Sequence, residues 1–442
     1  MTDTTQLKTS DDTETTPAPA GTLPPAEGQG GFTSTRAERL CALLSYITAY
    51  LYVNAITNNF RGRINWLILL TCGGIIAITE LLNRERRPCR ESFVWLGCFV
   101  VCTVRICFNW FFGTVWDEAE VYLFTHIFCV WWVLSRSGKL LEGKSGHLLP
   151  LDAVNGFIRF PFGSFFLRLK TVGTLSSERK NGRGKDRKGI WWTVLAAVLC
   201  VVLFFLATEL LTDADEGFAG LLDGFWKTLD IDFGDFWFYF FFSLPVGCWL
   251  FGLMAGSARC GGETLERQRL GLYGFLERIR RVPAGLWIAV TGLFSALYLA
   301  FFILQGSYLF GAFTRTLPEG FVVAEYARRG FFELCKVIAV NFSVLWLVTR
   351  MADEKARENR FFLAICLVFL AESMLFAVIA FSKLALYISC FGYTPLRVQS
   401  TWLVCVLFAG CVLWTVNLLT GRKLFRLWML LGAVSLTVLV LV

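Results

Sequence analysis

Charged residues are scarce in this chain. Only 17% of its 442 residues are Asp, Glu, Lys or Arg, whereas 55% are hydrophobic and 16% are aromatic. An ordinary soluble domain carries about a quarter charged residues and cannot hide this much apolar surface from water. The scarcity of charge therefore excludes a soluble globular protein and indicates a membrane protein.

Motifs for metal binding and for common catalytic sites are also lacking. The chain has no CxxC pair, and most of its fifteen cysteines lie inside apolar segments, so we expect neither a disulfide framework nor a metal site. Neither HExxH nor GxSxG occurs, which argues against the common hydrolases that use them. We expect no cofactor. An enzyme stays an alternative, because enzymes embedded in membranes often lack such motifs.

Apolar segments of the length needed to cross a bilayer recur eleven times. The hydrocarbon core is about 30 Å thick and takes about 20 residues of helix. Because lipid offers no hydrogen-bond partner to the backbone, the sequence predicts an all-α fold, a polytopic transmembrane helical bundle of about 11 spans. The segments cover residues 40–57, 65–82, 92–113, 119–135, 190–211, 236–256, 285–305, 330–348, 361–383, 398–419 and 425–442.

The charges between these segments alternate in sign. The loop at 136–189 holds twelve Lys and Arg against four acids, and the loop at 212–235 holds seven acids against one lysine. Basic loops stay in the cytoplasm, so we expect the N-terminus to be cytoplasmic. The loop at 58–64 is the exception, since it would place two arginines outside. This distribution explains the net charge of +8 without nucleic acid as a partner.

Four regions follow from this pattern. Residues 1–37 have almost no large apolar side chains and are expected to form a disordered cytoplasmic tail. Residues 38–135 make a first group of four membrane helices, and residues 190–442 make a second group of seven. The basic loop at 136–189 contains an amphipathic part at 148–170, which fits a segment lying among headgroups and binding anionic lipid. A loop packed beneath the bundle, with charges that only obey the orientation rule, explains it as well.

Several polar side chains lie deep inside the predicted membrane segments, where each is a candidate functional group. Arg105, which Asn109 follows one turn later, and Glu372 are expected within about 3 Å of the same depth, at 1.5 Å per residue. His126 lies at a similar level. Opposite charges at one depth should pair, so we predict a midplane polar site made of these four residues. The alternative is a structural ion pair, and His126 with Cys129 alone makes a weak metal site.

The segment at 305–334 is the most unusual part of the chain. Glu325, Arg329 and Glu333 follow at i, i+4 and i+8, so one guanidinium can lie between two carboxylates. We expect Lys383 near the outer surface, where its side chain snorkels to water. Such an outer-mouth site would bind an anionic or zwitterionic headgroup or solute; alternatively, the residues only fix the angle of a helix. The candidate residues are Gln305, Tyr308, Glu325, Tyr326, Arg328, Arg329, Glu333, Lys383, Tyr387 and Arg397.

Two motifs in the C-terminal third are specific when taken together. They comprise Gln305, residues 308–311 (YLFG) and residues 325–334 (EYARRGFFEL), followed by Tyr387, Gly392, Thr394 and Arg397. The chain thereby resembles a family of bacterial multi-pass membrane proteins, the domain-of-unknown-function 4153/4173 group. That family tends to have Arg where Lys383 stands and Leu where Tyr393 stands. The resemblance implies a bacterial cell membrane location and supplies no activity or substrate.

Three functions are compatible with these observations. The first prediction is a transporter-like protein whose midplane charges bind a small solute or a coupling ion. The first alternative is a membrane scaffold or sensor, whose tail and basic loop meet cytoplasmic proteins. The second is a membrane-embedded enzyme acting on a lipid or lipid-linked substrate, with the outer-mouth residues holding its headgroup. The expected partners are the lipid bilayer and a solute or headgroup.

Overall fold

The computed structural model confirms the predicted all-α fold. It describes residues 32–59, 65–109, 115–178, 233–280, 282–306, 323–353 and 358–442, with a few isolated positions. Within these ranges the regular secondary structure is helical, and one isolated bridge joins Val282 and Ala352. Ten of the eleven predicted segments coincide with helices. The segment at 190–211, nearly all of the tail at 1–37 and most of the acidic loop at 212–235 lie outside the described residues.

Six helical stretches are long and apolar enough to cross a membrane, which indicates a membrane protein. They are Arg36–Thr57, Phe236–Arg259, Ala284–Leu304, Gly330–Met351, Arg360–Phe391 and Pro395–Thr420. The helices Trp66–Leu82 and Phe425–Val440 are apolar but shorter. Two further helices, Arg90–Cys107 and Glu118–Arg136, carry charged residues at both ends. The count of about eleven spans and their orientation stay predictions.

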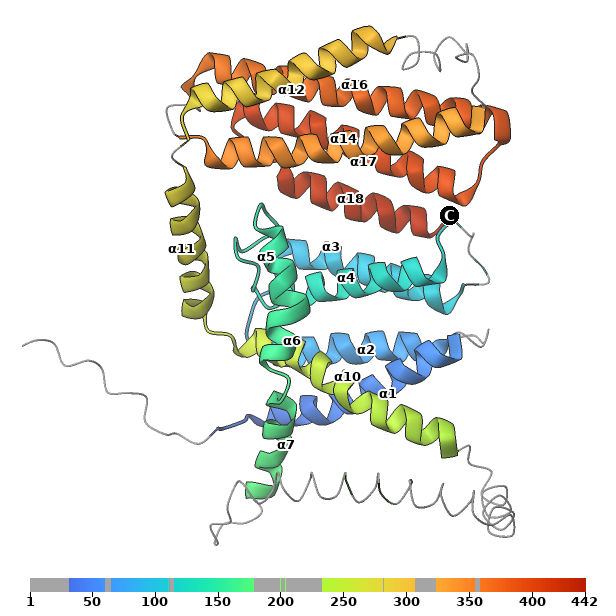
Figure 1. Ribbon diagram of the computed structural model, residues 1–442. Helices are drawn as coiled ribbons and strands as arrows, with labels where there is room; N and C mark the ends of the chain where they lie inside the picture. Colours follow the sequence, from blue (N-terminus) through green and yellow to red (C-terminus); the bar gives the residue numbers. More distant parts are fainter. Residues whose placement is uncertain are drawn as a thin grey trace, which may run out of the picture.

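An N-terminal group of helices packs in two layers (Figure 1). It consists of α1 (Arg36–Asn59), α2 (Trp66–Leu82), α3 (Arg90–Cys107), α4 (Glu118–Arg136) and α10 (Phe233–Arg259). One layer is α1 with α2 and α10, and the other is α3 with α4. Aromatic rings fill the second layer, where the buried rings of Phe99 and Trp132 stack at 6.1 Å. The sequence had assigned α10 to the second group, but its main contacts are with α1.

A C-terminal group surrounds the long helix α16. It consists of α12 (Ala284–Leu304), α14 (Val323–Met351), α16 (Arg360–Phe391), α17 (Pro395–Thr420) and α18 (Phe425–Val440). Helices α12, α14 and α17 each pack against α16, while α18 contacts α17 on one side and α3 on the other. Two separate hydrophobic cores result, because the buried side chains of α18 join the N-terminal core. Helix α18 is therefore the seam between the groups.

Five shorter elements run across the ends of these helices (Figure 1). They are α5 (Leu149–Val154), the π-helix η1 (Asn155–Arg159), α6 (Phe160–Gly163), α7 (Leu167–Glu178) and α11 (Gly262–Ile279). Helix α11 connects the two groups and docks on η1, where the amide of Gln268 exchanges hydrogen bonds with that of Asn155. The amphipathic segment at 148–170 is mostly helical and packs partly beneath the bundle, against α10 and α4.

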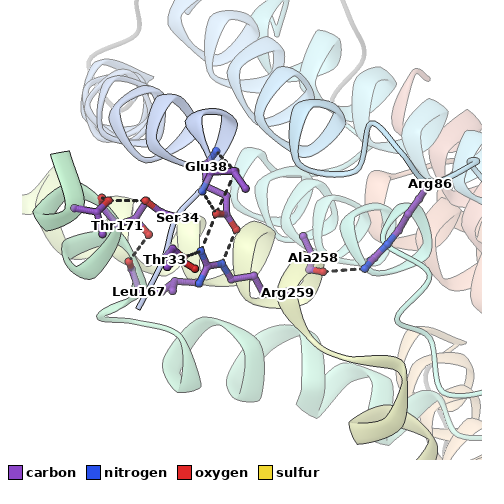
Figure 2. Close-up of polar contacts among 10 residues, drawn as sticks. Thr33, Ser34, Glu38, Arg86, Leu167, Thr171, Ala258 and Arg259 are labelled. Carbon is purple, nitrogen blue, oxygen red and sulfur yellow. Dashed lines mark hydrogen bonds and ion pairs between the residues drawn. The ribbon is translucent and has the colours of Figure 1, made fainter. Parts of the chain in front are cut away.

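Four of the segments predicted to be cytoplasmic meet at one end of the described structure. Arg86, between α2 and α3, donates hydrogen bonds to the carbonyls of Ser137 (2.9 Å) and Ala258 (3.0 Å). Arg259 forms a two-pronged ion pair with Glu38 at the start of α1 (2.5 and 2.7 Å), and Figure 2 shows these contacts. These contacts hold together the start of α1, the turn between α2 and α3, and the ends of α4 and α10.

Candidate functional site

Lys383 is fully buried in the C-terminal group, with 0% of its side chain exposed. The expected snorkelling is wrong, because the side chain turns into the bundle and packs on Gly330 of α14. A Cβ atom at position 330 would lie 2.6 Å from Lys383 Nζ, so any other residue there would force the lysine side chain to shift. Gly330 and Glu333 both belong to the motif at 325–334, but residue spacing alone cannot show that this helix packs against α16.

A cavity of about 250 Å³ lies beside Lys383. Glu333 of α14 also lines it and acts electrostatically on Lys383, so one acid and one base share the wall. The rest of the wall is aromatic and aliphatic. The lining residues are Leu297, Tyr298, Phe301, Gly330, Glu333, Leu334, Val337, Phe376 and Lys383, and we call this space the C-terminal cavity.

Hydrogen-bonded polar side chains continue from the C-terminal cavity into the bundle. The hydroxyl of Tyr298 donates to Asn341 Oδ1 (2.5 Å), and Asn341 Nδ2 donates to Ser373 Oγ (2.9 Å). Ser373 in turn donates to the carbonyl of Phe369 (2.8 Å). Three helices, α12, α14 and α16, are joined by this chain. Such bonds hold membrane helices together, at about 0.6–2 kcal/mol each.

Glu372 lies near the middle of α16 and faces α12. Its carboxylate is beside Ser295, and it acts electrostatically on Tyr298. The Oε2 atom of Glu372 is buried and has no hydrogen-bond partner among the described residues. Eleven residues separate Glu372 from Lys383, which is about 17 Å along the helix at 1.5 Å per residue. Polar groups thus extend along much of one face of α16.

The structure does not bring Arg105 to Glu372. Arg105 lies in the last turn of α3, which ends at Cys107 rather than continuing to residue 113, so it is not at mid-helix. Its Nε donates to the carbonyl of Val440 (3.1 Å), and its Nη1 donates to Asn109 Oδ1. Asn109 in turn donates to Glu118. Two of the four predicted midplane residues therefore form a separate cluster at the seam with α18.

His126 occupies a third place, near the middle of α4. Its Nδ1 lies 2.5 Å from the carbonyl oxygen of Tyr122, and its Nε2 bonds to the hydroxyl of Tyr52 on α1. The ring is thus held by two partners in the N-terminal group. No group of three or more His, Cys, Asp or Glu in the described part of the chain could hold a metal ion.

The other outer-mouth candidates divide into two sets. The guanidinium of Arg397 lies over the ring of Tyr387, 4.1 Å from its centroid, and donates to the carbonyl of Phe391 (2.8 Å). This pair closes the turn between α16 and α17. Gln305 is exposed at the end of α12. Tyr308 and the side chains of Glu325, Tyr326, Arg328 and Arg329 lie outside the described residues.

One motif escaped the sequence reasoning. Residues 138–145 (GKLLEGKS) fit the G-x-x-x-x-G-K-[ST] pattern of phosphate-binding loops. Such a loop follows a strand, whereas this one follows α4. Its amides already bind the protein's own carboxylates: Leu141 N–H donates to Asp152 (2.9 Å), and Ser145 N–H donates to Glu91 (3.1 Å). The segment is therefore a structural turn rather than a nucleotide site.

Comparison with known proteins gives one match. The profile of the family described as Domain of unknown function (DUF4153) matches residues 93–442. It covers α3 to α18, and therefore the whole of the C-terminal cavity. No curated protein and no solved structure matches the chain.

Proposed function

The chain belongs to the DUF4153 family, and from that premise we propose that it is a transporter-like carrier of a bacterial inner membrane. It crosses the bilayer about eleven times, with its N-terminus in the cytoplasm. Support for this topology comes from the contacts among the basic segments, which gather at one end of the molecule. Arg86, Lys139 and Arg259 all lie there, with Lys139 Nζ 2.5 Å from the carbonyl oxygen of Cys260.

The two charged residues of the C-terminal cavity, the buried Lys383 and the exposed Glu333, carry this proposal. A lysine at 0% exposure inside an apolar bundle is costly to keep, so an intramembrane site of this kind marks a substrate or ion pathway. Lys383 and Glu333 line a cavity of about 250 Å³, and Tyr298 in the same wall begins the polar chain. Open space beside paired charges is what a binding site needs.

The wall chemistry favours a small zwitterionic or anionic solute with an apolar part. The Lys383 ammonium would bind a carboxylate or phosphate, and the Glu333 carboxylate would bind an amine. The rings of Phe376 and Phe302, 4.7 Å apart, form part of the apolar surroundings. Glu372, farther along the polar face of α16, is the candidate group for a coupling proton or ion.

Lipid is the second expected partner, at the cytoplasmic end. Ile158, Phe162 and Phe166 are 55–60% exposed in the segment that crosses the helix ends, and Arg159 and Lys170 accompany them. Exposed apolar side chains beside basic ones suit the headgroup region of a membrane with anionic lipid. This segment would position the bundle in the inner leaflet.

Uptake by proteoliposomes tests the carrier. Three probes share a phenyl group: phenylalanine is a zwitterion, 3-phenylpropionate is an anion and phenethylamine is a cation. We expect the wild type to take up phenylalanine and Lys383→Met to lose this uptake. Glu333→Gln should still take up 3-phenylpropionate but neither of the other two probes. The matched control is Lys336→Met, which replaces an exposed lysine on α14, about one turn after Glu333. Uptake that is the same in Lys383→Met and Lys336→Met, or no uptake of any probe, would overturn the proposal.

A further inference from the structure

A second cavity, of about 280 Å³, lies between the two layers of the N-terminal group. All five helices of that group contribute to it, and we call it the N-terminal cavity. Its walls are mainly apolar. The lining residues are Tyr52, Ile68, Thr71, Cys72, Ile75, Phe99, Thr103, Tyr122, Thr125, His126, Cys129, Val130, Val246, Trp249 and Leu250. No Asp, Glu, Lys or Arg is among them, in contrast to the C-terminal cavity.

The threonines in this wall have already used their hydrogen-bond donors. Each hydroxyl donates to a carbonyl one turn back in its own helix: Thr71 to Leu67 (2.9 Å), Thr103 to Phe99 (2.8 Å) and Thr125 to Val121 (2.7 Å). A hydroxyl bonded in this way is turned toward its own backbone. The threonines therefore add no donor for a polar ligand.

Tyr52 and His126, in the same wall, form a hydrogen bond with each other. The carbonyl oxygen of Tyr122 can only accept, so His126 Nδ1 carries the proton. Because no acidic side chain lines the cavity to balance an imidazolium, we assign the neutral ring. Its Nε2 then accepts the hydroxyl proton of Tyr52. The pair is neutral, and the lone pairs of the Tyr52 oxygen are its one remaining polar feature.

The position of the cavity restricts what can enter it. His126 lies near the middle of α4, and Val246 and Trp249 lie near the middle of α10. These three, with Tyr52 and Tyr122, are the half-buried members of the wall, and the other lining residues are buried. The opening is therefore at the depth of the hydrocarbon core, where charged or strongly polar solutes are rare.

We propose that the N-terminal cavity binds the hydrocarbon chain of a bilayer lipid. An apolar cavity excludes water and takes up apolar molecules. The dense packing of a helical interior otherwise leaves few voids of this size. A lipid chain reaches mid-membrane by itself, fits a neutral wall and needs no donor from it. The ligand would hold the two layers of the N-terminal group together.

Photolabelling in nanodiscs tests this inference. The probe is a phosphatidylglycerol whose acyl chain ends in a diazirine, and the comparison probe carries the diazirine on the headgroup. We expect the chain-end probe to label the wall peptides around Tyr52 and His126, and the headgroup probe to leave them unlabelled. Thr125→Trp fills the cavity and should remove the labelling. Leu123→Trp, on the same helix but 58% exposed, is the matched control and should not.

Val246→Phe fills the cavity from α10 and serves if Thr125→Trp does not fold. The inference is overturned if a folded filling variant is labelled as strongly as the wild type. It is also overturned if the headgroup probe labels the wall as strongly as the chain-end probe. Neither result depends on solute uptake, so the carrier proposal can stand or fall separately.

Discussion

The two groups of helices differ in where they keep their ionisable side chains. In the C-terminal group, the buried Lys383 and the exposed Glu333 line one cavity. In the N-terminal group, the buried ionisable residues gather at the helix ends, as with Arg136, which binds Glu80 through two bonds of 2.7 Å, and Asp152 beneath α4. The N-terminal cavity itself is lined by neutral side chains.

This difference separates a structural use of charge from a functional one. Arg136 is 5% exposed, and its guanidinium is fully engaged: besides Glu80, it donates to the carbonyls of Arg86 (3.1 Å) and Asn83 (3.2 Å). Charges tied up in this way fix the ends of helices. Charges beside open space can exchange partners with a ligand. We therefore assign solute binding to the C-terminal group and lipid binding to the N-terminal group.

The largest expected effect is a pH dependence confined to the N-terminal group. Burial raises the pKa of Asp152 from its ordinary 3.8 to about 7, and the nearby Glu142 and Glu91 raise it further, while the amide of Leu141 lowers it. The folded state thus keeps a proton that the unfolded state has lost. The free energy of unfolding should fall by about 1.4 kcal/mol per pH unit between roughly pH 4 and 7.

Thermal unfolding between pH 5 and 8 checks this sign. The wild type should lose stability as the pH rises toward 7, and Asp152→Asn, which cannot ionise, should flatten the slope. A wild-type slope that is unchanged in Asp152→Asn would show that the carboxyl does not titrate in this window. The Lys383→Met variant should keep the slope, because Lys383 belongs to the other group.

Substitution of Gly330 tests the close approach of Lys383. Gly330→Ala places a Cβ atom 2.6 Å from Nζ and 3.0 Å from Cδ of Lys383. We expect the free energy of unfolding to fall by about 1–3 kcal/mol and the uptake of phenylalanine to be lost. Gly292→Ala on α12 is the matched control. Its Cβ would meet only Ile365, at 4.0 Å, so it should stabilise the helix by about 0.5–1 kcal/mol. Equal midpoints of thermal unfolding for the two variants would contradict this packing.

Two tyrosines with similar bonds should behave differently in function. Tyr298→Phe leaves Asn341 Oδ1 without its donor, and Tyr52→Phe does the same to His126 Nε2. Each substitution should lower the free energy of unfolding by about 1–2 kcal/mol. Only Tyr298 lines the C-terminal cavity. Uptake of phenylalanine should therefore fall in Tyr298→Phe and stay unchanged in Tyr52→Phe. The reverse order would place the solute in the N-terminal group.

The smallest expected effect is at the connection between the groups. The hydroxyl of Tyr273 on α11 donates to Glu142 Oε1 (3.0 Å), so Tyr273→Phe should cost about 0.5–1.5 kcal/mol. Amide hydrogen exchange in α11 should become faster, with little change within either group. Tyr393→Phe, at an 80% exposed position, should leave the exchange unchanged. Faster exchange throughout α16 instead would mean that α11 stabilises the C-terminal group directly.

The sequence predicts the positions of the helices well, but it predicts poorly which helices and which side chains are in contact. Hydropathy located the helices, because the apolar length that spans a bilayer is a local property. Depth along a helix did not reveal that Arg105 meets Val440 at the seam while Glu372 faces α12, since that depends on which helices are neighbours. The contact of Lys383 with Gly330 was not predicted for the same reason. The N-terminal cavity has no linear motif, because it is assembled from residues far apart in the chain, and the motif at 325–334 supplies only Gly330, Glu333 and Leu334 of the C-terminal cavity.

The most direct test compares both ligands on the same variants. Equilibrium binding of labelled phenylalanine and photolabelling by the chain-end lipid are measured on Lys383→Met and on Thr125→Trp. The account predicts that Lys383→Met loses phenylalanine binding and keeps lipid labelling, and that Thr125→Trp does the opposite. If one variant loses both ligands while remaining folded, or if neither variant changes either, the division of binding between the two groups is contradicted.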